Sequence, residues 1–161
     1  LANVMESEGI EAMVSIWRND DYGNGVVEHT HANFEKTGTV EPGIAYNQEQ
    51  STFSSEVSIL ADNVQELVDE YGADKVAVLM VGYDESVDII QSAANYDILS
   101  NVRWFGAETY VGVSYFAEDR IANEFINSVK FTALFVSDEG NTGGSHDRVI
   151  EHVRNEFGTD P

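Results

Sequence analysis

The sequence contains no cysteine, only two prolines and only eight lysines and arginines among its 161 residues. Without cysteine there is no disulfide, no thiolate metal site and no cysteine nucleophile, but the compartment stays open because many exported proteins also lack cysteine. The eight basic residues stand against 29 aspartates and glutamates, so the formal net charge is −21. This charge repels phosphate backbones and anionic lipid surfaces, which argues against nucleic acid as a partner.

Lysine is especially scarce and occurs only at Lys36, Lys75 and Lys130. Surfaces rich in acid and poor in lysine suit proteins that work in high salt, where screening weakens self-repulsion. An ordinary acidic surface explains the same composition, so a halophilic and a mesophilic interpretation both stay open.

Long hydrophobic runs are absent too: none approaches the roughly 18 residues of a membrane span, and no signal segment opens the chain. We therefore expect no direct membrane insertion by this segment. A helical pattern already covers residues 1–9, which indicates a processed or excised piece whose targeting signal, if any, is gone. Hydrophobic residues make up 42% of the chain, as in globular proteins, and 161 residues fit one domain or one lobe of a larger protein.

Short apolar runs alternate with longer helical patterns, the arrangement that builds parallel strand–helix–strand units. Strands are predicted over residues 12–17, 43–46, 76–81, 102–105 and 132–136. The third is apolar on both faces, as expected of a central strand covered by helices on each side. The sequence therefore predicts an α/β fold, a three-layer open, mainly parallel sheet of about five strands with helices on both faces.

Helices are predicted between the strands from helical spacing and from capping residues. The clearest has Ser51 or Thr52 as its N-cap and stops at Gly72. Further helices are predicted over residues 26–36, 84–95, 118–129 and 146–157, with Asp84 and Glu85 in the first turn of the helix over 84–95. Residues 137–145, rich in Gly, Asp, Asn and Ser, are predicted to form a loop.

Polar side chains follow three of the predicted strands. They are Asp20, Asp21, Tyr22, Tyr83, Asp84, Glu108 and Thr109. Because the carboxyl ends of parallel strands lie along one edge of a sheet, we expect these groups to share that edge, where open α/β sheets hold their ligands. Most have a structural explanation when taken singly, since Asp20 and Asp21 are typical turn caps and Asp84 is typical of a helix cap. Glu108 has no such explanation.

Gly23 and Gly25 form a partial dinucleotide-binding fingerprint, but Glu28 stands where the third glycine belongs. A pyrophosphate here would also meet the negative charge of Asp20 and Asp21. The two glycines are therefore interpreted as serving the turn itself.

Histidines and serines show no catalytic or metal-binding pattern. His29, His31, His146 and His152 have no metal-ligand spacing and are interpreted as surface residues. No Gly-x-Ser-x-Gly elbow occurs, and residues 145–147 place Ser, His and Asp side by side, whereas a triad is assembled from separate loops. We therefore expect no catalytic residue, no metal and no cofactor, and we interpret the protein as a non-enzyme.

A receiver-like phosphoacceptor domain is a minor alternative. Receiver domains use an acidic pair after the first strand, a phosphoacceptor aspartate after the third, a hydroxyl residue after the fourth and a lysine after the fifth. Asp20, Asp21, Asp84 and Thr109 match the first three of these features. The lysine is missing, and Asp84 begins a helix instead of ending the strand.

Five segments together resemble the second lobe of type I periplasmic binding proteins, the branched-chain amino-acid receptor group of ABC importers. They are VSIWRNDDYGNG at 14–25, TFSSEV at 52–57, VGYD at 81–84, WFGAE at 104–108 and FGTDP at 157–161. The segments follow the family's order and spacing and cover nearly the whole chain, although residues 137–148 match no motif of it. The resemblance implies that residues 1–161 form a single α/β lobe of a receptor hinged around a cleft, whose first lobe is not in this sequence.

Residue by residue, the resemblance implies that Tyr22 and Tyr83 are aromatic cleft residues and that Glu108 pairs with the α-ammonium group of an amino-acid ligand. Asp21 and Asp84 adjoin the tyrosines and are carried as further ligand-binding candidates. Their negative charge suits a cationic or zwitterionic ligand and disfavours an anionic one.

The resemblance also implies partners and a location. The intact receptor would bind a small amine-bearing solute, an amino acid or a related amine, and deliver it to the membrane permease of an ABC importer. It would work outside the cytoplasm, in the periplasm or anchored at the cell surface. The same lobe would serve equally as the sensory ligand-binding domain of a signalling receptor, because the difference lies outside residues 1–161.

Overall fold

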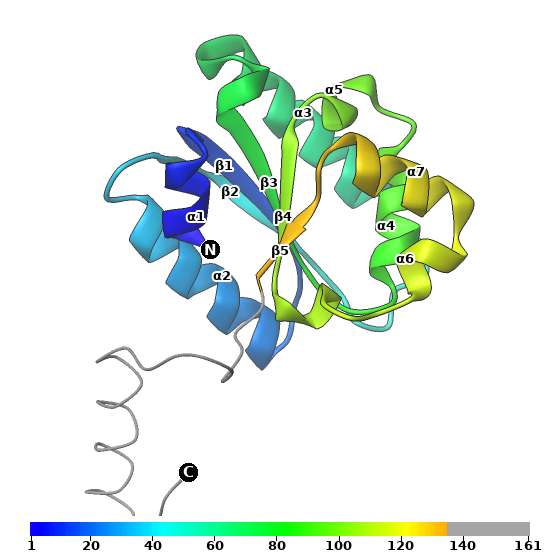
Figure 1. Cartoon of the computed structure of the whole chain (residues 1–161). Helices are drawn as coiled ribbons and strands as arrows, with labels where there is room; N and C mark the ends of the chain where they lie inside the picture. Colours follow the sequence, from blue (N-terminus) through cyan, green and yellow to red (C-terminus); the bar gives the residue numbers. More distant parts are fainter. Residues whose placement is uncertain (135–161) are drawn as a thin grey trace, which may run out of the picture.

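The computed structural model describes residues 1–134. Five strands form one sheet in the order β2-β1-β3-β4-β5, and every neighbouring pair is parallel (Figure 1). The strands are β1 Ala12–Arg18, β2 Thr39–Tyr46, β3 Val76–Val81, β4 Arg103–Gly106 and β5 Thr132–Ala133. The predicted α/β class with a parallel sheet of five strands is confirmed.

Helices cover both faces of the sheet, as predicted. They are α1 Ala2–Ser7, α2 Asp21–Phe34, α3 Ser54–Tyr71, α4 Ser86–Ala93, α5 Asp97–Ser100, α6 Tyr115–Glu118 and α7 Arg120–Ser128, with short 3-10 turns η1 Ala73–Lys75 and η2 Glu108–Tyr110. Helices α1 and α2 lie on one face, and α3, α4 and α7 lie on the other (Figure 1). The three layers follow because right-handed connections that run toward β2 and those that run toward β5 pack on opposite faces of the sheet.

The central strand β3 is buried along its whole length. Val76, Val78 and Met80 pack into the apolar cluster under α3, α4 and α7, whereas the alternate residues Ala77 and Leu79 pack into the cluster under α1 and α2. Alternation along a strand sends neighbouring side chains to opposite faces, so a strand covered on both sides has no polar position. The doubly apolar run in the sequence predicted this placement correctly.

Strand β2 starts at Thr39, four residues before the predicted start at 43. Residues 39–42 were not predicted as a strand because Glu41 and Pro42 are poor strand formers. β2 is an edge strand, so Pro42 is tolerated where no further strand needs its missing N–H. At Gly43 a Cβ would overlap the backbone carbonyl oxygen of Ser15 in β1, which explains the glycine.

Helix α2 begins at Asp21, five residues before the predicted start at 26. Asp20 is its N-cap, and the Asp20 carboxylate accepts a hydrogen bond of 2.7 Å from the backbone N–H of Gly23. This bond satisfies one of the free N–H groups of the first turn. The polar segment after β1 is therefore the first turn of a helix, and the interpretation of Gly23 and Gly25 as glycines of a turn was wrong, because both lie in α2.

Two other predicted helix starts also moved. Phe53, not Ser51 or Thr52, is the N-cap residue of α3 and makes no side-chain cap bond. Its ring is buried against Tyr46, with centroids 5.2 Å apart, so packing fixes where this helix begins. Helix α4 begins at Ser86, so Glu85 is the N-cap residue, again without a side-chain bond, and the expectation that Asp84 caps the helix was wrong.

The helix predicted over residues 118–129 corresponds to α7, whereas Glu118 ends the separate short helix α6 and Asp119 lies between the two. The Asp119 carboxylate accepts a 2.8 Å hydrogen bond from the backbone N–H of Ala122 and so begins α7. The predictions for residues 135–161 lie outside the described residues, including the end of the fifth strand, the loop, the last helix, His146 and His152. No helix within residues 1–134 is long and apolar enough to cross a membrane.

Candidate ligand-binding site

The strand order places a topological switch between β1 and β3, because the chain leaves β1 toward β2 on one side and later continues from β3 on the other. Ligand sites of open α/β sheets lie outside the carboxyl ends of the strands at such a switch. Tyr22 follows β1 and Tyr83 follows β3, and their ring centroids are 5.9 Å apart with a tilt of 41°. Two residues chosen from the sequence are thus neighbours at the switch point.

Tyr22 lies in the first turn of α2 and is half-buried. Its hydroxyl oxygen is buried from solvent. Within residues 1–134 this oxygen has no hydrogen-bond partner. Burial raises the pKa of Tyr22, and the nearby Glu108 carboxylate raises it further. The phenol therefore stays protonated, and its O–H group remains a hydrogen-bond donor. This donor therefore lies beside a carboxylate at the edge where a ligand would enter.

Glu108 begins the η2 turn directly after β4 and is exposed. The turn below it is firmly held, because the Thr109 hydroxyl donates a 2.8 Å hydrogen bond to the Gly82 carbonyl and Tyr110 is buried. Within the described residues the Glu108 carboxylate makes no ion pair. An exposed carboxylate on a fixed turn is free to accept hydrogen bonds from an added cation.

Asp21 and Asp84 are the two remaining candidates, and each adjoins one of the tyrosines in the sequence. Asp21 is exposed in the first turn of α2, and Asp84 is exposed in the loop between β3 and α4. Burial together with the negative charge of Asp84 raises the pKa of Tyr115 to about 12, so Asp84 lies on the α6 side of the edge. The structure therefore groups Tyr22, Tyr83 and Glu108, whereas within residues 1–134 neither aspartate makes a hydrogen bond or an ion pair with any of the three.

Arg18 at the end of β1 is the residue that the sequence interpretation missed. Its guanidinium pairs with Asp20 at 2.8 Å and approaches Glu85 at 3.7 Å. It also donates a 3.0 Å hydrogen bond to Gln48 and lies over the Tyr83 ring, 5.0 Å from the centroid. The edge is therefore less acidic than the sequence suggested, because this cation offsets the carboxylates beside it.

A buried polar layer lies beneath the exposed residues. The Tyr46 hydroxyl donates a 2.8 Å hydrogen bond to Glu85, and the hydroxyls of Ser86 and Tyr110 share a 2.7 Å bond. Burial, and then the Glu85 charge, raise the pKa of Tyr46. A Cβ at Gly82 would overlap the Tyr46 hydroxyl oxygen and lie 2.8 Å from the Ser86 oxygen, so only glycine fits among these groups.

Two observations argue against the receiver-like alternative, because residues that it needs are already engaged in other contacts. Asp20 is engaged with both oxygens, one as the N-cap of α2 and one with Arg18. The Thr109 hydroxyl is engaged with a backbone carbonyl. Within residues 1–134 no three histidine, aspartate or glutamate side chains gather closely enough to hold a metal ion.

His31 is not the surface residue that the sequence suggested. It is half-buried, and its Nε2 lies 2.7 Å from the hydroxyl of Ser15, which is fully buried in β1. Burial lowers the pKa of His31, which favours the neutral ring. Helical periodicity could have predicted this contact. His31 lies one helical turn after Val27, and Val27 packs on the side of α2 that faces the sheet. His29 is exposed, as expected.

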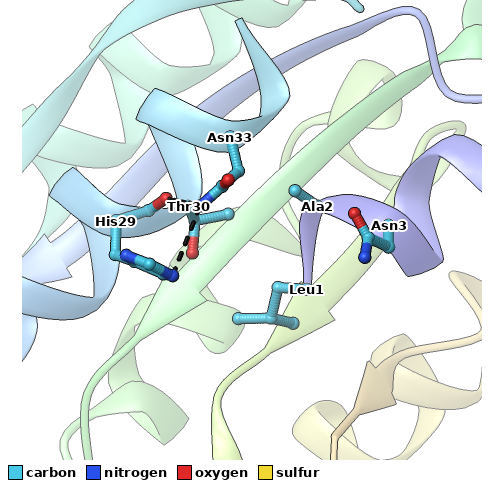
Figure 2. Close-up of a pocket in the computed structure, with 6 residues that line it drawn as sticks. All are labelled: Leu1, Ala2, Asn3, His29, Thr30 and Asn33. Carbon is cyan, nitrogen blue, oxygen red and sulfur yellow. Dashed lines mark hydrogen bonds between the residues drawn. The ribbon is translucent and has the colours of Figure 1, made fainter. Parts of the chain in front are cut away.

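Two adjoining hollows lie on the α1 and α2 face. One is lined by Leu1, Ala2, Asn3, His29, Thr30 and Asn33, and Figure 2 shows these residues facing each other across the gap between α1 and α2. The other, of about 360 Å³, shares Leu1, His29 and Thr30 with the first and extends past Val26 to Glu108. Mostly apolar walls therefore adjoin the exposed carboxylate.

The chain resembles solved structures of binding proteins from ABC transporters. A leucine binding protein from Thermotoga maritima matches 99% of this chain at 15% identity with a TM-score of 0.56. A fatty acid ABC transporter substrate-binding protein from Thermomonospora curvata also matches 99% of it, at 15% identity with a TM-score of 0.58. An ABC transporter substrate-binding protein from Sphaerobacter thermophilus matches 80% of it, at 11% identity with a TM-score of 0.53.

The chain spans 43%, 40% and 39% of the length of these three structures, respectively. At such identities the likeness establishes the fold alone, and that fold resembles one lobe of a periplasmic binding protein. The enzyme 2-deoxy-scyllo-inosose synthase resembles the chain less closely, with a TM-score of 0.46, which is too low to bear on function. No protein-family model and no curated protein matches the sequence.

Proposed function

We propose that the chain is one ligand-binding lobe of a two-lobed receptor that binds a small amine-bearing solute, an amino acid, for ABC-type import and catalyses no reaction. The observation that carries this proposal is the grouping of Tyr22, Tyr83 and Glu108 at the switch point between β1 and β3. Two aromatic rings and one exposed carboxylate form a surface for a group that is partly apolar and positively charged.

The chemistry favours an ammonium group at Glu108. A carboxylate accepts strong, short hydrogen bonds from an ammonium ion, and the Tyr22 hydroxyl adds a neutral polar contact beside it. Glu108 is exposed in this lobe, so the bond gains its full strength only when a second lobe closes over it and removes water. The carboxylate end of the amino acid would then be held by that second lobe.

The similar structures leave the ligand open, because one is named for leucine and another for a fatty acid. Glu108 favours the amine, since an exposed acid beside the site would repel a fatty-acid carboxylate. The receptor would act outside the cytoplasm and dock on a membrane permease. Attached to a signalling domain, the same lobe would serve as a sensor with the same ligand chemistry.

Binding by the intact two-lobed protein tests the proposal. We expect calorimetry to detect an amino acid such as L-leucine, and we expect Glu108→Gln to weaken that binding by about 2–5 kcal/mol, the scale for truncating one partner of a buried charge pair. Glu66→Gln on α3 is the matched control, because Glu66 is exposed on the opposite face of the sheet. Equal affinity in the Glu108 and Glu66 variants would remove Glu108 from the site.

The 161-residue chain offers a second measurement. Titration with L-leucine and, separately, with a fatty-acid carboxylate should move the amide resonances of Tyr22, Tyr83 and Glu108 only for the amine-bearing ligand. The affinity should be weak, because a single wall neither encloses nor desolvates the ligand. Shifts confined to the fatty acid would contradict the proposed ligand class.

A further inference from the structure

Arg18 joins the segments that follow three different strands. It ends β1 itself, it donates a 3.0 Å hydrogen bond to Gln48 after β2, and its Nη1 lies 3.7 Å from the Glu85 carboxylate after β3. Its Nε lies 2.8 Å from the Asp20 carboxylate. The Arg18 side chain is 26% exposed, and these contacts hold its guanidinium in one place.

The held guanidinium lies over the ring of Tyr83, 5.0 Å from the centroid. Tyr83 needs such support, because it is 36% exposed and lies in the loop between β3 and α4. Its other aromatic neighbour is Tyr22, at 5.9 Å between ring centroids. Within residues 1–134, Arg18 and Tyr22 therefore both lie against this exposed ring and help to define where it lies.

We propose that Arg18 is a positioning residue: its guanidinium fixes the Tyr83 ring next to Tyr22 and so prepares the aromatic wall of the site before a ligand arrives. That the wall contacts a ligand rests on the proposed function, whereas the positioning does not. A planar guanidinium suits the task, because it stacks on a ring while its edge donates to carboxylate and amide oxygens. A lysine ammonium is a point charge and cannot do both.

The same contacts set the charge that the site presents. Arg18 pairs with Asp20 and lies near Glu85, so its positive charge offsets the negative charges of these two acids. It does not offset the negative charge of Glu108. A ligand therefore meets the exposed Glu108 carboxylate, which makes no ion pair within residues 1–134, near the Tyr83 ring. This arrangement suits a single ammonium group better than a ligand with two positive charges.

The positioning is tested by NMR on the 161-residue chain. In the wild type we expect nuclear Overhauser effects from the Arg18 side chain to the Tyr83 ring and between the Tyr83 and Tyr22 rings. In Arg18→Lys and Arg18→Gln we expect the Tyr83 ring resonances to move and the Tyr22–Tyr83 effects to weaken. Arg120→Gln is the control, because Arg120 forms its ion pair with Glu124 on the surface of α7, and the variant should leave Tyr83 unchanged.

Three results would overturn the proposal, the third only in its claim for the guanidinium plane. One is a wild type without Arg18–Tyr83 effects, which decides the matter even if the Arg18 variants do not fold. Another is a folded Arg18→Gln variant, by its far-UV circular dichroism, whose Tyr83 resonances and Tyr22–Tyr83 effects match the wild type. Rescue of the Tyr83 signals in Arg18→Lys would likewise show that charge alone suffices and that the guanidinium plane is not needed.

Binding of L-leucine to the intact two-lobed protein separates this proposal from the function it builds on. Releasing one ordered side chain should weaken binding about three- to tenfold in Arg18→Gln, with Arg120→Gln unchanged. Ordered Tyr83 signals without any leucine binding by the wild type would refute the proposed function and support the positioning. Leucine binding that is unchanged in Arg18→Gln would refute the role of Arg18 in the site and leave the proposed function intact.

Discussion

Gly23 and Gly25 lie two residues apart in α2, yet alanine at these positions should change stability in opposite directions. A Cβ at Gly23 would overlap the carbonyl oxygen of Arg18 and lie 3.1 Å from its carbonyl carbon. Both are backbone atoms, which cannot turn away as a side chain can. A Cβ at Gly25 would meet nothing within 4 Å. One glycine is therefore required by a close approach, and the other is not.

The magnitudes follow from two opposing contributions. Forcing a methyl group into a packed position costs about 1–3 kcal/mol, whereas replacing glycine by alanine inside a helix stabilises it by about 0.5–1 kcal/mol. Because the obstacle is backbone, we expect Gly23→Ala to lower the free energy of unfolding by about 1–2 kcal/mol net. Gly25→Ala should raise it by about 0.5–1 kcal/mol, since only the helix contribution remains.

Urea unfolding of the 161-residue chain, followed by far-UV circular dichroism, measures both variants. The experiment belongs in moderate salt, which screens the repulsion expected at a net charge of −21. In thermal melts each kcal/mol corresponds to about 2–4 °C for a chain of this size. Equal stability of the Gly23 and Gly25 variants would refute the close approach between α2 and the end of β1. That approach also places Tyr22, so its loss would weaken the site geometry.

Two further predictions concern buried polar groups. Gly82→Ala should lower the free energy of unfolding by about 1–3 kcal/mol, because its methyl group would overlap the Tyr46 hydroxyl. Urea unfolding measures this loss. A variant as stable as the wild type would contradict the prediction and show that the hydroxyl can move aside. For His31, whose pKa burial lowers, the stability present above the unfolded pKa of about 6.5 should be lost as pH falls through the folded pKa. Urea unfolding at pH 7.5 and 5.5 should show a smaller loss in His31→Gln than in the wild type or in His29→Gln, and an equal loss in all three would contradict it.

The strands were predictable from local signals, whereas several helix starts were not. Val76 to Val81 is apolar at every position, a pattern that only a strand covered on both faces requires, and it predicted β3 to the residue. The start of α2 escaped because two glycines argue against a helix. Gly23 is there because Arg18 lies close, and no local pattern reveals a contact with the preceding strand.

The same distinction holds for the site. Tyr22, Tyr83 and Glu108 could be grouped from the sequence because parallel strands bring their carboxyl ends to one edge, whatever the side chains are. Arg18 could not be assigned a role, because its role depends on Gln48, 30 residues later, and on Glu85, still further along. Strand order and loop course decide whether those atoms meet, and neither is written in the local sequence.

The carboxyl edge has two layers with different tasks. Ser86 and Tyr110 are bonded to each other beneath the surface, where an unpaired polar group would be costly, so they fix the backbone after β3 and β4. Tyr83 and Glu108 lie above them and stay exposed, which leaves a ring face and a carboxylate available. Arg18 connects the layers, since it is largely buried yet contacts the exposed ring. A site built in this way can present binding groups on an ordered surface, because the buried layer holds the exposed residues in place.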